Sequence, residues 1–194
     1  MKQPLREALS RYSPEAIGDS TAAGAAVLLL LYEREAGPHI VFQKRSELVL
    51  HHKGQVSFPG GAADPRDHDA VHTALRETHE EIGVDPGHVE VLGRLDDIVT
   101  ISNFRVTPVV GWLDRYPYAW RVREAEVAYL IEAAVDDLRN PANFVEDRRV
   151  VGDREVVLPS YRVGDDLIWG ATARMLTNFL DIWASLDVSM SARR

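Results

Sequence analysis

The stretch Arg76-Glu77-Thr78-His79-Glu80-Glu81-Ile82-Gly83-Val84 decides how the rest of this chain is interpreted. In a helix, which turns by about 100° per residue, Glu77 and Glu81 lie one turn apart on the same side, with Glu80 beside them. Like charges at this spacing repel each other, and carboxylates are unfavourable near a helix C-terminus. A hard divalent cation with oxygen ligands would offset both costs.

The residues around this cluster predict a helix from about Asp69 to Ile82. Asp67 or Asp69 can cap its N-terminus, and Gly83 suits the left-handed position just after its end. The helix is expected to pack through a stripe at i, i+4, i+7 and i+11, formed by Val71, Leu75, Thr78 and Ile82. None of the three glutamates belongs to that stripe, so we expect the helix to present them on a second face.

An acidic run on a helix is by itself most often a solvated surface whose charges pair with Lys or Arg. The residues upstream favour a different interpretation. Together with Phe58-Pro59-Gly60-Gly61 the stretch resembles the Nudix box: a glycine, five residues, an acid, seven residues, then R-E-U-x-E-E-x-G-U, where U is aliphatic. The matching positions are Gly61, Arg76, Glu77, Glu80, Glu81, Gly83 and Val84. Asp67 replaces the upstream glutamate, with eight residues before Arg76, and Thr78 holds an aliphatic position.

The resemblance to the Nudix superfamily implies an α+β fold, a Nudix-type α/β/α sandwich with a mixed β-sheet. Its catalytic strand–loop–helix–loop module would span the box, residues 61–84. The resemblance also implies hydrolysis of a diphosphate with Mg²⁺ or Mn²⁺. By that likeness Glu77 and Glu81 hold the cation, Glu80 helps to bind it or activates water, and Arg76 completes the catalytic group. Gly60 and Gly61 would let the backbone approach phosphate.

Two segments before the box resemble the coenzyme A pyrophosphatase branch of the superfamily. They are Val41-Phe42-Gln43-Lys44-Arg45-Ser46 and Gly54-Gln55-Val56-Ser57-Phe58-Pro59-Gly60-Gly61. The branch reads roughly L-L-T-x-R-S, a spacer containing Arg, then G-x-V-x-F-P-G-G. This likeness implies cleavage of coenzyme A and its derivatives to 4′-phosphopantetheine and adenosine 3′,5′-bisphosphate. It places substrate contacts at Arg45, Ser46, Lys53, Gly54, Phe58, Gly60 and Gly61.

Leu50 departs from the branch pattern, because an arginine usually stands at that position. His51, His52 or Lys53 would have to supply the missing cationic contact. Without such compensation, we expect weak binding of coenzyme A and poor discrimination against related diphosphates, since a charge-assisted hydrogen bond is lost.

Several alternative functions remain open. Within the superfamily, the chain could be an ADP-ribose, dinucleotide or nucleoside-triphosphate pyrophosphatase. A non-catalytic nucleotide-sensing module is the alternative of another class, and the intact set Glu77, Glu80 and Glu81 argues against it. Isomerase chemistry would need a proton-donating cysteine or an equivalent group, and the chain contains no cysteine.

Composition limits the remaining classes. The 194 residues are expected to form one domain, residues 1–194, with residues 1–20 as an N-terminal extension. The net charge of −8 leaves no basic footprint for nucleic acid, so the expected partner is a small-molecule substrate. Residues 1–12 lack an apolar signal core and the apolar run 22–32 is too short to cross a bilayer. We therefore expect no membrane association and a cytoplasmic location, with the oligomeric state left open.

Patterning predicts the other elements as follows. Helices are expected at 4–12 and at about Ala171 to Leu186, the latter burying Met175, Phe179, Ile182 and Trp183. Strands are expected at 24–32, 39–45, 54–58, 88–95, 105–113 and 126–131. A turn containing Gly37-Pro38 joins the first two strands. Residues 145–169 are expected to be rich in strands, with turns at Gly152-Asp153 and Gly164-Asp165.

Overall fold

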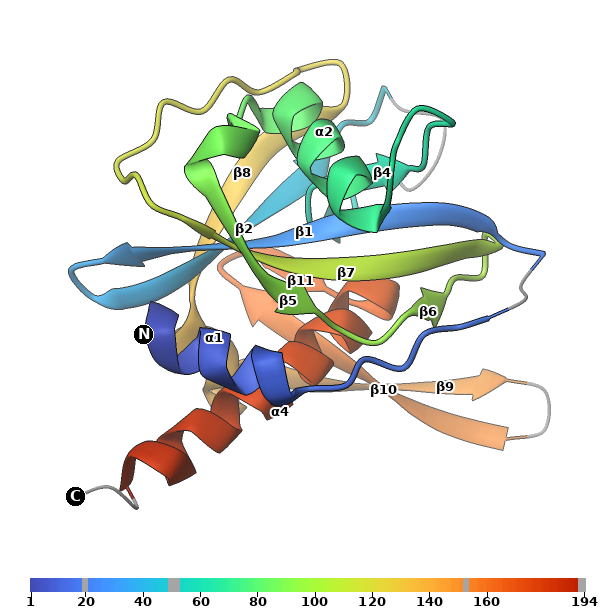
Figure 1. Cartoon of the computed structure of the whole chain (residues 1–194). Coiled ribbons are helices and arrows are strands. Elements are labelled where there is room, and N and C mark those ends of the chain that lie inside the picture. The colour runs from blue at the N-terminus through green and yellow to red at the C-terminus, as the bar shows by residue number, and fades with distance from the viewer. Residues whose placement is uncertain (19–20, 49–52, 152–153, 192–194) are drawn as a thin grey trace.

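A mixed β-sheet lies between two helical layers in the computed structural model, which describes residues 1–18, 21–48, 53–151 and 154–191 (Figure 1). Its central order is β3-β2-β1-β7-β5, and β1 and β7 pair in parallel. The strands are β1 (Ala23–Arg34), β2 (Gly37–Arg45), β3 (Val56–Ser57), β4 (Gly60–Ala62), β5 (Val89–Arg94), β6 (Ile98–Val99), β7 (Phe104–Leu113) and β8 (Val127–Ala134). β4 pairs with β1, β6 with β7, and β8 with β2.

The central strand β1 is apolar on both faces because helices cover both. Leu28 and Leu30 belong to the core cluster beneath α2 (Ala70–Ile82). Leu29 and Leu31 belong to a second cluster on the opposite face, which includes residues of α1 (Lys2–Arg11) and α4 (Gly170–Ser191). Figure 1 shows α2 on one side of the sheet and α1 with α4 on the other. The predicted α+β class and α/β/α layering are confirmed.

Helix α1 packs into the core, although its residues were expected to form an extension. Leu5 and Leu9 are buried against the second cluster. The hydroxyl of Tyr12, just after α1, donates to Asp96 at 2.6 Å and accepts from the amide of Asn178 in α4 at 3.0 Å. The start of the chain is thereby tied to the last helix.

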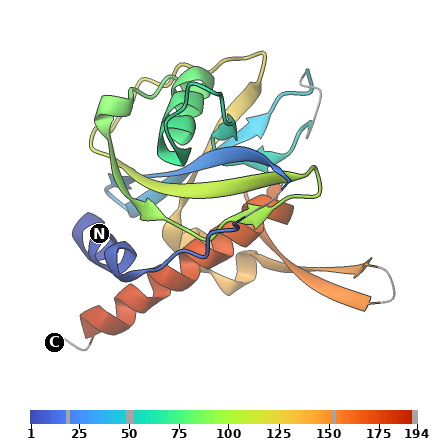
Figure 2. The same ribbon diagram turned by 45° about the vertical axis from the view of Figure 1, so that its right-hand side comes forward.

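The C-terminal third adds a small antiparallel sheet in the order β11-β10-β9. Its strands are β9 (Phe144–Val151), β10 (Arg154–Val163) and β11 (Asp166–Ile168), preceded by the short α3 (Val135–Arg139). The β9–β10 hairpin projects from the body of the molecule (Figure 2). Nζ of Lys44 in β2 donates to Asp166 in β11 at 2.6 Å, which links the small sheet to the large one.

Some local predictions are wrong. The turn between β1 and β2 is formed by Glu35 and Ala36, whereas Gly37 and Pro38 belong to β2. The strand expected at 54–58 is only Val56–Ser57, and the following glycines lie in β4, which was not predicted. Helix α4 continues past Leu186 to Ser191, and α3 was missed because five residues carry no clear period.

Other local predictions hold. The turn at Gly164-Asp165 is present, and the four predicted core residues of α4 are buried. The turn expected at Gly152-Asp153 lies outside the described residues. Within the described part of the chain, no helix combines the length and apolarity needed to cross a membrane.

Candidate active site

The helix that carries the acidic cluster begins and ends as the sequence predicts. The side chain of Asp69 caps α2 by accepting from the backbone N–H of His72 at 2.8 Å. Gly83 adopts the left-handed conformation with φ 74°. The packed face differs from the predicted stripe: Val71 and Leu75 are only half-buried, and the buried residues are Thr73, Ala74, Thr78, Glu81 and Ile82.

Glu81 therefore corrects the expectation that all three glutamates lie on a face separate from the packed one. Its residue is only 2% exposed, and its Oε2 accepts the backbone N–H of Gly60 at 2.8 Å. Nη1 of Arg45 lies 3.8 Å from the other oxygen, Oε1. Burial raises the pKa of Glu81 to about 7, although the N–H of Gly60, the nearby amide of Gln43 and the charge of Arg45 each lower it. The helix thus directs Glu81 toward the sheet, where burial disfavours the charged form of its carboxylate.

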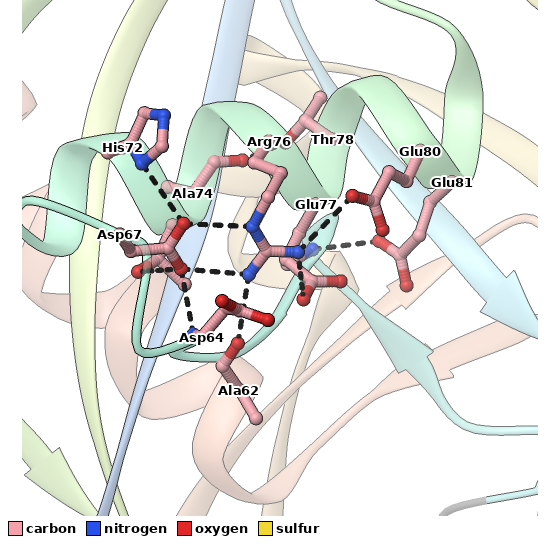
Figure 3. Close-up of polar contacts among 12 residues, drawn as sticks. Ala62, Asp64, Asp67, His72, Ala74, Arg76, Glu77, Thr78, Glu80 and Glu81 are labelled. Carbon is pink, nitrogen blue, oxygen red and sulfur yellow. Dashed lines mark hydrogen bonds and ion pairs between the residues drawn. The ribbon is translucent and has the colours of Figure 1, made fainter.

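Arg76 joins the upstream acid to the acidic cluster (Figure 3). Its Nε and Nη2 donate to the two oxygens of Asp67 at 2.9 Å each. Its Nη1 donates to Glu77 at 2.8 Å and lies 3.4 Å from Glu80. The Arg76 guanidinium holds the pKa of the buried Asp67 carboxyl well below its usual range. Arg76 thus pairs with two glutamates of the acidic cluster as well as with Asp67.

Asp67 is built into the loop despite the one-residue difference in spacing. It accepts the backbone N–H of Asp64 at 2.9 Å and the hydroxyl of Thr73 at 2.9 Å, and Nδ1 of His72 lies 3.0 Å from its Oδ1. With Arg76 on the same carboxylate, the loop is fastened to the first turns of α2. Its shorter side chain still reaches the arginine.

Gly60 and Gly61 are required for close approach within the protein. A Cβ on Gly60, whose φ is 146°, would lie 2.3 Å from the carbonyl oxygen of Ala26 in β1. A Cβ on Gly61 would lie 2.6 Å from the carboxylate carbon of Glu77. Both glycines make room for the partners that shape the site, a role distinct from the phosphate contact that the resemblance implies.

The donor set fits a hard divalent cation in its chemistry. Burial raises the pKa of Glu77, and the negative charges of Glu80 and Glu126 raise it further, against the lowering effect of Arg76. The negative charge of Glu77 in turn raises the pKa of Glu81. Added positive charge would relieve this repulsion. Glu80 is exposed and paired with Arg76, so among the described residues three ligating side chains do not already converge on one point.

The residues expected to contact substrate do not all lie next to the acidic cluster. Arg45 lies beside Glu81, whereas Lys53 is exposed in the turn before Gly54. Gly54 belongs to that turn and donates its N–H to the carbonyl of Arg45 at 3.2 Å. Ser46 is buried, and its hydroxyl accepts the backbone N–H of Leu48 at 3.2 Å. Leu50, His51 and His52 lie outside the described residues.

Phe58 contributes to the site through packing. Its ring is buried and stacks on Phe42, with ring centroids 4.7 Å apart, on the sheet face opposite α2. The ring is therefore turned away from the carboxylates, which lie on the α2 side. It supports the segment that carries Gly60 and Gly61.

No sequence pattern predicts a role for Gln43, Ser57 or Glu126. Gln43 is completely buried and pairs across strands with Ser57, on the side of the sheet that carries Glu81. Glu126 precedes β8, and its carbonyl accepts the N–H of Ser46 at 2.8 Å. A glutamine that directly follows the apolar residues Val41 and Phe42 in a strand is unusual, and the sequence shows it. Its role depends on which segment of the chain covers that face of the strand.

The family comparison covers more than half of the chain, since the NUDIX domain model matches residues 22–156. Nudix hydrolase 22 of Arabidopsis thaliana, described as chloroplastic, is 38% identical over 158 residues, which is 78% of this chain and 52% of that protein. The chain thus spans about half the length of that relative. A protein named "Uncharacterized Nudix hydrolase NudL" from Enterobacter sp. strain 638 is 35% identical over 154 residues, 78% of each chain.

Solved structures share the fold at much lower identity. A MutT/nudix family protein from Enterococcus faecalis matches with a TM-score of 0.53 and 13% identity, covering 89% of this chain and 64% of that one. The Nudix hydrolase RenU of M. smegmatis matches with a TM-score of 0.51 and 22% identity, covering 61% and 74%. With the family model, the relatives and the fold in agreement, the chain belongs to the Nudix hydrolase superfamily.

Proposed function

We propose that this protein hydrolyses the diphosphate of coenzyme A and its derivatives with Mg²⁺ or Mn²⁺, releasing 4′-phosphopantetheine and adenosine 3′,5′-bisphosphate. The observation that carries the proposal is the 3.8 Å separation of Arg45 Nη1 from Glu81 Oε1. It places a residue of the coenzyme A-branch segment beside a residue of the Nudix box. A diphosphate next to the box carboxylates would therefore meet a guanidinium, the side chain best suited to bidentate phosphate contacts.

Each carboxylate has a role in this proposal. Glu77 and Glu81 hold the cation, and Arg76 fixes the position of Glu77 through a 2.8 Å hydrogen bond. When bound, the divalent cation neutralises the diphosphate and lowers the pKa of an attacking water. Glu80 is the most exposed of the three glutamates, and it supplies a further oxygen ligand or accepts the water proton. The water oxygen bonds to phosphorus as the bond to the bridging oxygen breaks.

Product analysis tests the reaction and the substrate class together. The purified chain would be incubated with coenzyme A, ADP-ribose, a dinucleoside polyphosphate and a nucleoside triphosphate, each with Mg²⁺, with Mn²⁺ or with chelator. We expect coenzyme A to have the highest kcat/KM and to give the two named products only when cation is present. Glu77→Gln is the matched control for contamination, because it should abolish turnover.

Other outcomes would assign a different function. Preferred turnover of ADP-ribose, a dinucleotide or a triphosphate would refute the coenzyme A assignment while retaining the hydrolase. Saturable binding of one of these compounds, with no product from any of them, would refute the enzyme and favour a nucleotide-sensing module.

A further inference from the structure

Unpartnered buried polar atoms gather close to Glu81. Among the described residues, the buried side-chain atoms that lack a hydrogen-bond partner are Nε2 and Oε1 of Gln43, Nε of Arg45, Oγ of Ser57 and Oγ of Ser160. All except the Ser160 hydroxyl come from the β2–β3 pair. Gln43 is completely buried, and its amide lies close enough to Glu81 to lower the pKa of that carboxyl, yet neither amide atom meets strict hydrogen-bond geometry with a described partner.

The strand register places these side chains on one face. Gln43 and Ser57 are direct cross-strand partners, so they project to the same side of the sheet. Val41 belongs to the core cluster beneath α2, whereas Phe42 and Val56 belong to the cluster on the opposite face. Since side chains alternate along a strand, Gln43, Arg45 and Ser57 face α2, where Glu81 is buried.

Such an arrangement is costly unless the polar atoms have a use. Each buried polar group without a partner costs about 1–3 kcal/mol. A leucine at position 43 would fill a similar volume without that cost, and it would continue the apolar run of β2. Local rules are usually broken in this way at functional sites, where stability is given up for activity.

We propose that Gln43 and Ser57 are positioning residues for the cation site, acting through Glu81 and through the water shell of the cation. This inference rests on the proposed metal-dependent function. Magnesium keeps several of its waters when a protein binds it, and those waters need acceptors. The amide oxygen of Gln43 and the hydroxyl of Ser57 supply acceptors, and the amide NH₂ of Gln43 is a donor for the Glu81 carboxylate.

Cation affinity, rather than activity alone, tests the inference. The variants Gln43→Leu and Ser57→Ala would be titrated with Mn²⁺, and free Mn²⁺ measured by its electron paramagnetic resonance signal. We expect the Kd for Mn²⁺ to rise roughly 10–100-fold in Gln43→Leu, with a smaller rise in Ser57→Ala. In chelator, urea unfolding should show Gln43→Leu to be as stable as wild type or more stable, because a buried amide without well-formed hydrogen bonds is replaced by an apolar side chain.

Ser160→Ala is the matched control. Ser160 is also completely buried with an unpartnered hydroxyl, but it lies in β10, in the separate small sheet. The same serine-to-alanine change there should leave the Kd for Mn²⁺ unchanged. Unchanged Mn²⁺ affinity in Gln43→Leu and Ser57→Ala, in a wild type that binds Mn²⁺ and turns over substrate, would overturn this inference alone. If wild type binds no Mn²⁺, the proposed function fails with it.

Discussion

The guanidinium of Arg76 binds the carboxylate of Asp67 through two parallel hydrogen bonds of 2.9 Å, Nε to Oδ1 and Nη2 to Oδ2. This fork-to-fork geometry makes the pair directional as well as strong. Arg76 also donates a hydrogen bond to Glu77. Asp67 therefore orients the acidic cluster indirectly, through Arg76.

Removing the Asp67 carboxylate should therefore damage both stability and turnover. Asp67→Ala takes away the bidentate partner of Arg76, so we expect a loss of about 2–3 kcal/mol in the free energy of unfolding, measured with urea. The kcat should fall because Arg76 no longer fixes Glu77. Asp64→Ala is the control, since Asp64 contacts the exposed Arg66. Wild-type stability in Asp67→Ala would contradict this role for the pair.

Gly61→Ala should disable the site while preserving the fold. Its added Cβ would lie 2.6 Å from the Glu77 carboxylate, which must move. We expect kcat to fall about 100-fold, the scale for a displacement of roughly 1 Å in an active site, with an unchanged circular dichroism spectrum. In Gly24→Ala the new Cβ meets only the Cβ of Ala63 at 3.6 Å, so near wild-type activity is expected there. Equal activity in both variants would show that Glu77 need not occupy its present position.

Divalent cation should stabilise the protein against heat. At 100 times its Kd, a cation that binds only the folded state contributes about 2.7 kcal/mol. For a chain of this size we expect Tm to rise by roughly 5–10 °C when Mn²⁺ is added, measured by calorimetry. Glu77→Gln and Glu81→Gln should fold but lose this rise together with turnover. A rise that persists in both variants would place the cation elsewhere.

Replacing Arg45 and replacing Lys53 should have different effects on the kinetics with coenzyme A. Arg45 is partly buried beside Glu81, so Arg45→Ala should lower kcat as well as raise the KM for coenzyme A. Lys53 is exposed, so Lys53→Ala should raise KM only, with a smaller effect at high salt. Comparison with 3′-dephospho-coenzyme A shows which cationic side chain reads the 3′-phosphate. If both variants discriminate the two substrates as wild type does, neither residue contacts that phosphate.

The link between the two sheets should weaken in acid. Burial alone would raise the pKa of Asp166, but hydrogen bonds from Lys44 and Tyr129 outweigh it and hold that pKa below its usual value. A lowered folded pKa stabilises the fold above the unfolded value, near pH 4, and the effect is lost as pH falls through the folded pKa. The hydrogen bond to Asp166 raises the pKa of Lys44, so that contribution is lost in strong alkali.

Unfolding free energies of wild type and Asp166→Asn, measured against pH, check this expectation. Near neutral pH we expect wild type to be more stable by about 1–2 kcal/mol, with the difference shrinking below pH 4. Asp165→Asn, at the exposed neighbouring position, should follow wild type at every pH. A constant difference for Asp166→Asn down to pH 2 would show that the charge of Asp166 does not stabilise the fold.

The sequence by itself determined the helix, its caps and the carboxylate spacing. These features depend on local geometry: an Asp side chain can reach the third backbone N–H, Gly83 tolerates positive φ, and residues four apart share a helical face. The apolar runs of β1 and of α4 were equally predictable, because burial on both faces of a strand and on one side of a long helix leaves a clear pattern.

Only the tertiary structure decided how the cluster is used. The stripe rule assigned Glu81 to an exposed face, but β4 and the end of β2 cover it, which burial statistics for glutamate do not anticipate. That Asp67 reaches Arg76 despite its shifted spacing depends on the path of the loop. The environment of Gln43 depends on strand register and on which helix lies above it. Such contacts join residues far apart in the chain, so no local pattern encodes them.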